Sequence, residues 1–168
     1  MRQLLSVILL AACTAVPAQS QAFIGELDWA DYHNERFGLG LSYPTSVFRL
    51  ERATTDGDGR LFRSRDGRAR LLVGAFVNAD GLSPASYQRF AARYSYPGMR
   101  IDYAPSGRNW TVLSGIRGDT MVYEKAMFSC GGSLINSFAM LYPVEERRFY
   151  DPIVERIEDS FRPGRGEC

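Results

Sequence analysis

Apolar and polar positions alternate along short stretches from residue 29 onward, and this alternation favours β-strands. Asp66-Gly67 separates two of these stretches and is typical of a tight hairpin turn. The stretch 133–142 is apolar on both faces over much of its length, which predicts a position near the centre of a sheet. The predicted strands are 29–34, 39–44, 47–52, 60–65, 69–78, 99–104, 110–117, 120–130 and 133–142.

One segment between the strands has a helical period instead. Ser83 is the predicted N-cap of this helix, Pro84 is its first residue, and Tyr96-Pro97-Gly98 ends it. The spacing i, i+3, i+4 and i+7 predicts one buried face. That face consists of Tyr87, Phe90, Ala91 and Tyr94.

A second helix is predicted near the C-terminus. Asp151 is expected to cap it, Pro152 to be its first residue, and Pro163 to stop it. Ile153, Ile157 and Phe161 are expected to line its buried face.

The order of these elements, together with three short motifs, resembles the PsbP-like superfamily. The motifs are Phe37-Gly38, Tyr43-Pro44 and Ser160-Phe161. The resemblance covers residues 29–163 and implies an α+β fold in which an antiparallel β-sheet is sandwiched between helices (an α/β/α sandwich). It also implies a binding or assembly role. The superfamily includes an extrinsic photosystem II protein, a Ran-binding factor and small bacterial periplasmic lipoproteins, which share no common active site.

The composition is that of one packed domain, predicted over residues 23–168. The chain has 168 residues, of which 45% are hydrophobic and 12% aromatic, so a sizeable core is expected. The formal net charge is only +1. Nucleic-acid binders usually carry a strong basic excess, so no nucleic-acid partner is predicted.

The N-terminus has the pattern of an export signal. Arg2 precedes the apolar run 4–12, which is shorter than the ~20 residues that span a bilayer, so no transmembrane helix is predicted in the mature protein. Cleavage after Ala22 gives a secretory signal over 1–22 and a periplasmic or secreted protein. Alternatively, Leu10 to Cys13 form a lipobox, in which case residues 1–12 are a lipoprotein signal and Cys13 carries a lipid anchor.

Either cleavage leaves two cysteines, Cys130 and Cys168. Exported compartments are oxidising, so a disulfide between them is predicted, with two free thiols as the alternative. The chain has a single histidine and no CxxC motif, so its ligand set for zinc is very small.

The stretch 54–65 resembles the start of a calcium loop, because Asp56 and Asp58 alternate with glycines. An EF-hand loop needs a bidentate acid at its twelfth position. With Gly59 at the sixth position, Arg65 falls at the twelfth. The stretch is therefore interpreted as glycine-rich turns, and neither a metal site nor a cofactor is predicted.

Four arginines flank the Asp66-Gly67 turn. A two-residue turn would place Arg65 opposite Arg68 and Arg63 opposite Arg70, all on one face, with Phe62 and Leu71 on the other. Opposed like charges destabilise a sheet, whereas paired guanidinium groups suit an oxyanion. The face is therefore either neutralised by solvent and local carboxylates such as Glu51 and Asp66, or it contacts an anion. A bulged turn would shift this register.

Catalysis has little support in the sequence. His33, beside Asp31 and Glu35, is the only available imidazole, and no GxSxG motif is present. The leading hypothesis is an exported non-enzymatic binding or accessory protein of the bacterial cell envelope. Its expected partner is an anionic lipid, a glycan or a protein. The alternatives are a protein-docking assembly factor and a small envelope hydrolase that uses His33.

Overall fold

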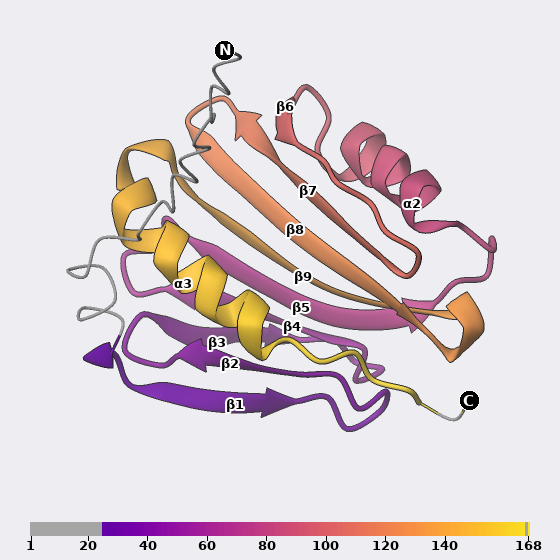
Figure 1. Ribbon diagram of the computed structural model, residues 1–168. Coiled ribbons are helices and arrows are strands. Elements are labelled where there is room, and N and C mark those ends of the chain that lie inside the picture. Colours follow the sequence, from indigo (N-terminus) through magenta and orange to yellow (C-terminus); the bar gives the residue numbers. More distant parts are fainter. Residues whose placement is uncertain (1–24, 167) are drawn as a thin grey trace, which may run out of the picture.

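The computed structural model describes residues 25–166 and 168, and it contains the nine predicted strands and both predicted helices (Figure 1). The strands are β1 (Trp29–His33), β2 (Gly40–Pro44), β3 (Phe48–Ala53), β4 (Gly59–Ser64), β5 (Arg70–Val77), β6 (Arg100–Tyr103), β7 (Trp110–Arg117), β8 (Thr120–Ser129) and β9 (Leu134–Pro143). The helical elements are α2 (Pro84–Phe90), the π-helix η1 (Ala91–Ser95), the 3₁₀ turns η2 (Cys130–Gly132) and η3 (Val144–Glu146), and α3 (Arg147–Ser160).

Strands β3 to β9 form one seven-stranded antiparallel sheet in the order β3-β4-β5-β9-β8-β7-β6. Strand β9 is the fourth of the seven, so its predicted central position is confirmed. Successive side chains point to opposite faces, and both Ile135 and Phe138 of β9 are buried because each face has its own core. Strands β1 and β2 form a separate two-stranded sheet.

One face of the sheet, which we call the closed face, is covered by α3 and the β1–β2 hairpin (Figure 1). Ile153, Ile157 and Phe161 are almost fully buried there, as their spacing predicts. Phe161 packs edge-on against Phe138 at 5.2 Å between ring centroids. The closed face therefore holds the main hydrophobic core of the protein.

The opposite face, which we call the open face, is covered only in part. Helix α2 and η1 lie against β7 and β8, where Leu113, Val122 and Ala126 are buried. On this face β5 is covered only in part: Tyr87 of α2 contacts Phe76, and Leu72 and Phe76 are each 40% exposed. The predicted α+β sandwich is confirmed, although its second layer is shorter than its first.

The first helix departs from its predicted face. Ser83 caps it as expected, since its Oγ accepts a hydrogen bond from the Ser86 amide. Tyr87 and Ala91 are buried, but Phe90 and Tyr94 are 47% and 61% exposed, so the prediction is wrong for those two. The cause is the π-helical turn η1, in which the Tyr96 amide donates to the Ala91 carbonyl at 3.0 Å. This wider turn brings Tyr96 inward in place of Tyr94.

The second helix begins earlier than predicted, at Arg147. Turn η3 leads directly into it, so Pro152 lies inside the helix and Asp151 is not its cap. Proline lacks the N–H that would bond to the Arg148 carbonyl, so one helical hydrogen bond is lost near the start. Asp151 instead accepts a hydrogen bond from the Tyr142 hydroxyl at 2.7 Å.

The C-terminal segment after α3, residues 161–166 and 168, packs against the closed face, and we call it the strap. A disulfide joins Cys130 to Cys168, whose Cα atoms are 5.3 Å apart, as predicted. Four residues before Cys168, the Gly164 amide donates a hydrogen bond to Asn136 Oδ1 at 2.9 Å. A Cβ at Gly164 would collide with the Phe37 carbonyl oxygen, so only glycine allows this close approach. The strap thus ties the β1–β2 hairpin to β8 and β9.

The predicted signal over residues 1–22 and the candidate lipidation site Cys13 lie outside the described residues. Within residues 25–166, no helix has both the length and the apolar character needed to cross a membrane.

Candidate functional site

The four hairpin arginines do not share one surface. Arg63 pairs with Arg70, and Phe62 with Leu71, in the predicted register. The turn, however, is longer than two residues. The Ser64 amide donates to the Ala69 carbonyl, and Ser64 Oγ accepts from the Ala69 amide at 2.8 Å. These bonds close the strands at Ser64 and Ala69 and leave Arg65 and Arg68 in the connecting loop.

Two of these arginines are neutralised by carboxylates. Arg63 binds Glu51 through two hydrogen bonds of 2.6 and 2.8 Å, and its guanidinium group lowers the pKa of Glu51. Arg68 forms ion pairs with Asp66, Glu145 and Glu146.

The other two arginines differ from each other. Arg65 Nε donates to the Ser46 carbonyl at 2.9 Å. Arg70 forms no hydrogen bond or ion pair with the side chains that the structure describes. Its side chain lies on the open face of the sheet, where it lines a groove.

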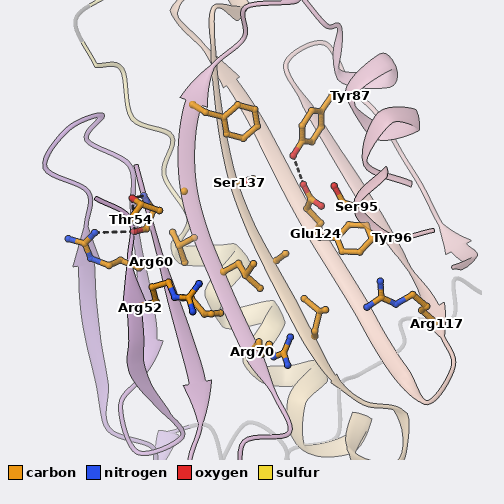
Figure 2. A pocket seen from close by; sticks show the side chains of 18 residues that line it. Arg52, Thr54, Arg60, Arg70, Tyr87, Ser95, Tyr96, Arg117, Glu124 and Ser137 are labelled. Atoms are coloured by element: carbon orange, nitrogen blue, oxygen red, sulfur yellow. Dashed lines mark hydrogen bonds between the residues drawn. The ribbon is translucent and has the colours of Figure 1, made fainter. Parts of the chain in front are cut away.

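Arg70 lines a groove of about 530 Å³ on the open face (Figure 2). Side chains from β3, β4, β5, β7, β8, β9 and the α2–η1 segment surround it. A volume of this size is within the usual range for small-molecule sites. The lining residues are Arg52, Thr54, Gly59, Arg60, Leu61, Arg70, Leu72, Val73, Gly74, Phe76, Tyr87, Ser95, Tyr96, Arg117, Glu124, Ser137, Ala139 and Leu141.

The sheet register explains why this face is hollow. Gly59 lies opposite Gly74, Gly74 opposite Ser137, and Ser137 opposite Ala126, which makes a row of small residues across four strands. The backbones approach closely at the edge of this row, since a Cβ at Gly59 would lie 2.8 Å from the Val73 carbonyl oxygen. The groove is therefore a consequence of residue size at successive positions of the sheet.

Four arginines surround the groove: Arg52, Arg60, Arg70 and Arg117. Within the described chain, none of them forms an ion pair. The only hydrogen bond that their guanidinium groups form with described residues is from Arg60 Nη1 to the Gly59 carbonyl, at 3.0 Å. Among the described residues that line the groove, the sole carboxylate is buried in its wall. The guanidinium groups therefore leave an excess of positive charge around the opening.

That carboxylate is Glu124, which is 6% exposed. The Tyr87 hydroxyl donates to its Oε1 at 2.6 Å (Figure 2). Burial raises the pKa of Glu124, and hydrogen bonds from Tyr87 and Tyr96 oppose this effect without cancelling it. The same burial, together with the nearby carboxylate, raises the pKa of Tyr87. A buried carboxyl with a raised pKa beside a groove is typical of functional sites.

The comparisons with known proteins concern the fold. No family model and no curated protein sequence matches the chain. The solution structure of cyanobacterial PsbP (CyanoP) from Synechocystis sp. PCC 6803 matches with a TM-score of 0.58 and 11% identity, over 83% of this chain and 95% of that one. The fold is PsbP-like. The Ran-binding protein Mog1p of Saccharomyces cerevisiae has the same fold, with a TM-score of 0.58 and 8% identity, over 82% of this chain and 96% of that one.

The resemblance stated from the sequence is thus confirmed for the fold. At such low identity the PsbP-like fold does not assign a function. The chemistry of the groove depends on the side chains of this chain and not on the shared fold.

The remaining candidate residues lie away from the groove. His33 is exposed at the end of β1, and no side chain of the described residues forms a hydrogen bond with it. Arg36 forms an ion pair with Asp58 and donates to the Asp56 carbonyl at 3.2 Å, so both residues of the former calcium candidate contact an arginine. The described residues contain no cluster of three or more His, Cys, Asp or Glu suited to a metal.

Sequence reasoning missed most of the groove. Its lining residues come from positions 52 to 141, and only the strand register brings them together. One signal was available for Glu124. Val122, Ala126 and Phe128 are apolar at alternate positions of β8, so the carboxyl between them had to face the core side.

Proposed function

We propose that this protein is an exported, non-enzymatic binding or accessory protein of the bacterial cell envelope, and that its groove binds an anionic ligand or partner. The observation that carries the proposal is the set of four arginines around one groove without ion-pair partners in the described chain. Guanidinium groups form strong paired hydrogen bonds with carboxylates and phosphates. An anion in the groove would supply the charge that these arginines lack.

Binding accounts for the groove better than catalysis does. Its titratable side chains, within the described chain, are the four arginines, two tyrosines and Glu124. Neither His33 nor a cysteine lines it. Glu124 is held by Tyr87 at the back of the wall, which suits a fixed structural carboxyl more than a group that exchanges protons with substrate.

The proposed location rests on two features. The N-terminal sequence has the pattern of an export signal, and disulfides such as Cys130–Cys168 are typical of oxidising compartments. Intact-mass spectrometry of the mature protein tests this location. A start at Phe23 supports a periplasmic or secreted protein, whereas a diacylated Cys13 supports a membrane-anchored one. An uncleaved N-terminus contradicts both.

The anion proposal is tested with the triple variant Arg52→Ser, Arg70→Ser and Arg117→Ser. The matched control is Arg63→Ser, Arg65→Ser and Arg68→Ser, which removes the same charge outside the groove. We expect the groove variant to lose at least about tenfold in affinity for phosphatidylglycerol, heparin or long-chain carboxylate probes, since each charged contact contributes ~1.5 kcal/mol or more. Retained binding contradicts the proposal. Loss in the control alone assigns the contact to the hairpin surface of Arg63, Arg65 and Arg68.

A protein-docking role is the second candidate. The observation that favours it is the exposure of Leu72 and Phe76, which line the groove, and of Val77 at the end of β5. A photo-crosslinking residue at Phe76 tests it in cells. A specific cross-linked protein that disappears with Leu72→Asp supports docking, and a pattern identical to that of the same crosslinker at exposed Glu35 contradicts it.

A further inference from the structure

The groove is polarised along its length. Arg70 and Phe76 point to the same face of β5, and six residue steps of extended strand place their Cα atoms ~20 Å apart. Arg117 lies toward the Arg70 end, because Arg117 pairs with Thr120 at the same end of the sheet as the Arg70–Leu141 pair. Figure 2 shows Arg70 and Arg117 toward one end and Tyr87 toward the other. Arg70 and Arg117 thus place two positive charges at one end, while Arg52 lies opposite Leu61 in the middle of the groove.

The opposite end of the groove is aromatic, and apolar side chains from β4, β5 and β9 line its middle between Arg52 and Glu124. Phe76 and Tyr87 pack with their ring centroids 6.1 Å apart at the far end. Between the two ends, the register places Leu61 beside Leu72 and Leu72 beside Ala139. Leu72 and Phe76 remain 40% exposed although they line a concave surface. Exposed apolar side chains in a concavity indicate a ligand with an apolar part.

Glu124 limits where charge can lie. It is in the same row as Leu72 and Ala139, between the cationic and the aromatic ends. A ligand anion beside this carboxyl would be repelled whenever the carboxyl is ionised. The part of a ligand that passes Glu124 is therefore expected to be uncharged.

We propose that the groove binds a monomeric single-chain amphiphile, with its carboxylate or phosphate between Arg70 and Arg117 and its acyl chain extended toward Phe76 and Tyr87. This inference rests on the proposed function, because it requires that the groove binds an anion. It adds the chemical class of the ligand and its direction in the groove.

The test compares five probes by calorimetry, each below its micellar concentration: dodecanoate, dodecyl phosphate, butyrate, inorganic phosphate and dodecyl maltoside. We expect both long-chain anions to bind. Butyrate should bind on the order of a hundredfold or more weaker than dodecanoate, because eight methylene groups lose their burial. Inorganic phosphate should likewise be far weaker than dodecyl phosphate. The uncharged maltoside should be at least about tenfold weaker than either long-chain anion.

Two variants locate the two parts of the ligand. Arg70→Ser with Arg117→Ser should weaken dodecanoate at least about tenfold. Leu72→Gln with Phe76→Gln should weaken dodecanoate and leave the weak phosphate binding unchanged. Both positions are surface-exposed, and circular dichroism with thermal melting confirms that each variant is folded before binding is measured.

The outcomes separate the inference from the function on which it rests. If butyrate and dodecanoate, or phosphate and dodecyl phosphate, bind with equal affinity that depends on the arginines, that result contradicts the amphiphile proposal and supports the anion site. Binding to phosphatidylglycerol vesicles without binding to any monomeric amphiphile also overturns it, in favour of a membrane surface. Absence of arginine-dependent binding to every anion overturns both proposals.

Discussion

The two faces of the seven-stranded sheet are built from the same strands but differ in what covers them. On the closed face, helix α3, the β1–β2 hairpin and the C-terminal strap bury a continuous apolar core. On the open face, α2 and η1 cover β7 and β8, and the rest carries exposed Leu72 and Phe76, a row of small residues and arginines. The closed face thus contributes most of the buried apolar core, whereas the open face carries exposed apolar side chains and arginines without ion pairs in the described chain.

This difference shows where the fold departs from the rules of stable packing. A buried carboxyl, four cations without ion pairs in the described chain and exposed apolar side chains all reduce stability, and all three features meet at the groove. The closed face has comparable charges but pairs them, as Lys125 does with Glu158 at 2.7 Å. If the two faces differ in this way, substitutions on the closed face should cost more stability than substitutions on the open face.

The largest expected effect is in the closed-face core. Phe138→Ala should reduce the free energy of unfolding by about 3–5 kcal/mol, because a fully buried ring leaves a cavity between Tyr123 and Phe161. Leu72→Ala on the open face should cost about 1 kcal/mol or less, since Leu72 is 40% exposed. Urea denaturation measures both values. If the two substitutions lowered the free energy of unfolding by similar amounts, the open face would be covered in solution and the two faces would not differ in burial.

The next effect is at the strap. Cys130→Ser with Cys168→Ser should lower the free energy of unfolding by about 3–4 kcal/mol, because the disulfide closes a loop over a sequence separation of 38. Thermal melting of the variant and of the reduced wild-type protein should agree. Binding to the groove should be unchanged at temperatures where the variant is folded, since no strap residue lines it. A stability loss below about 1 kcal/mol would show that the hydrogen bonds of Gly164 hold the strap without the disulfide.

The sequence predicted the closed face better than the open one, and the reason is physical. Ile153, Ile157 and Phe161 follow one helical period, and β9 is apolar on both sides, so local patterns were enough to place α3 and the sheet centre. The start of α3 was missed because Pro152 is tolerated inside the helix. The open face depends on a π-helical turn, which exchanges Tyr94 for Tyr96, and on residues that only the strand register brings together. Neither feature has a local sequence period.

Replacing Glu124, in the wall of the groove, is expected to increase stability, by less than the core and disulfide substitutions reduce it. The raised pKa of Glu124 means that the folded protein retains a proton which the unfolded chain releases above about pH 4.3. Its contribution therefore lowers stability as pH rises from that value to the pKa of the folded state, and the loss then stays constant. Glu124→Gln keeps an oxygen that accepts from Tyr87 and removes this loss.

We accordingly expect the Glu124→Gln variant to melt at a higher temperature than the wild-type protein at neutral pH. This rise should be smaller than the decrease caused by Phe138→Ala or by loss of the disulfide. The two proteins should converge toward pH 4. Comparing them cancels the opposite contributions of Glu51 and Asp66, whose lowered pKa values add stability as pH rises. A gap that does not change with pH would mean that Glu124 is not the group responsible.

The smallest effects distinguish a paired arginine from an unpaired one within the same hairpin. Arg63→Ser removes the two hydrogen bonds to Glu51 and should lower the melting temperature slightly, by an amount that shrinks as sodium chloride is added. Arg70 lies directly opposite Arg63, on β5, and Arg70→Ser breaks no ion pair with a described residue. It should leave the melting temperature unchanged or raise it, while weakening anion binding. If Arg70→Ser destabilises the protein as much as Arg63→Ser, then Arg70 has a structural role, and the positive end of the groove is explained by folding rather than by a ligand.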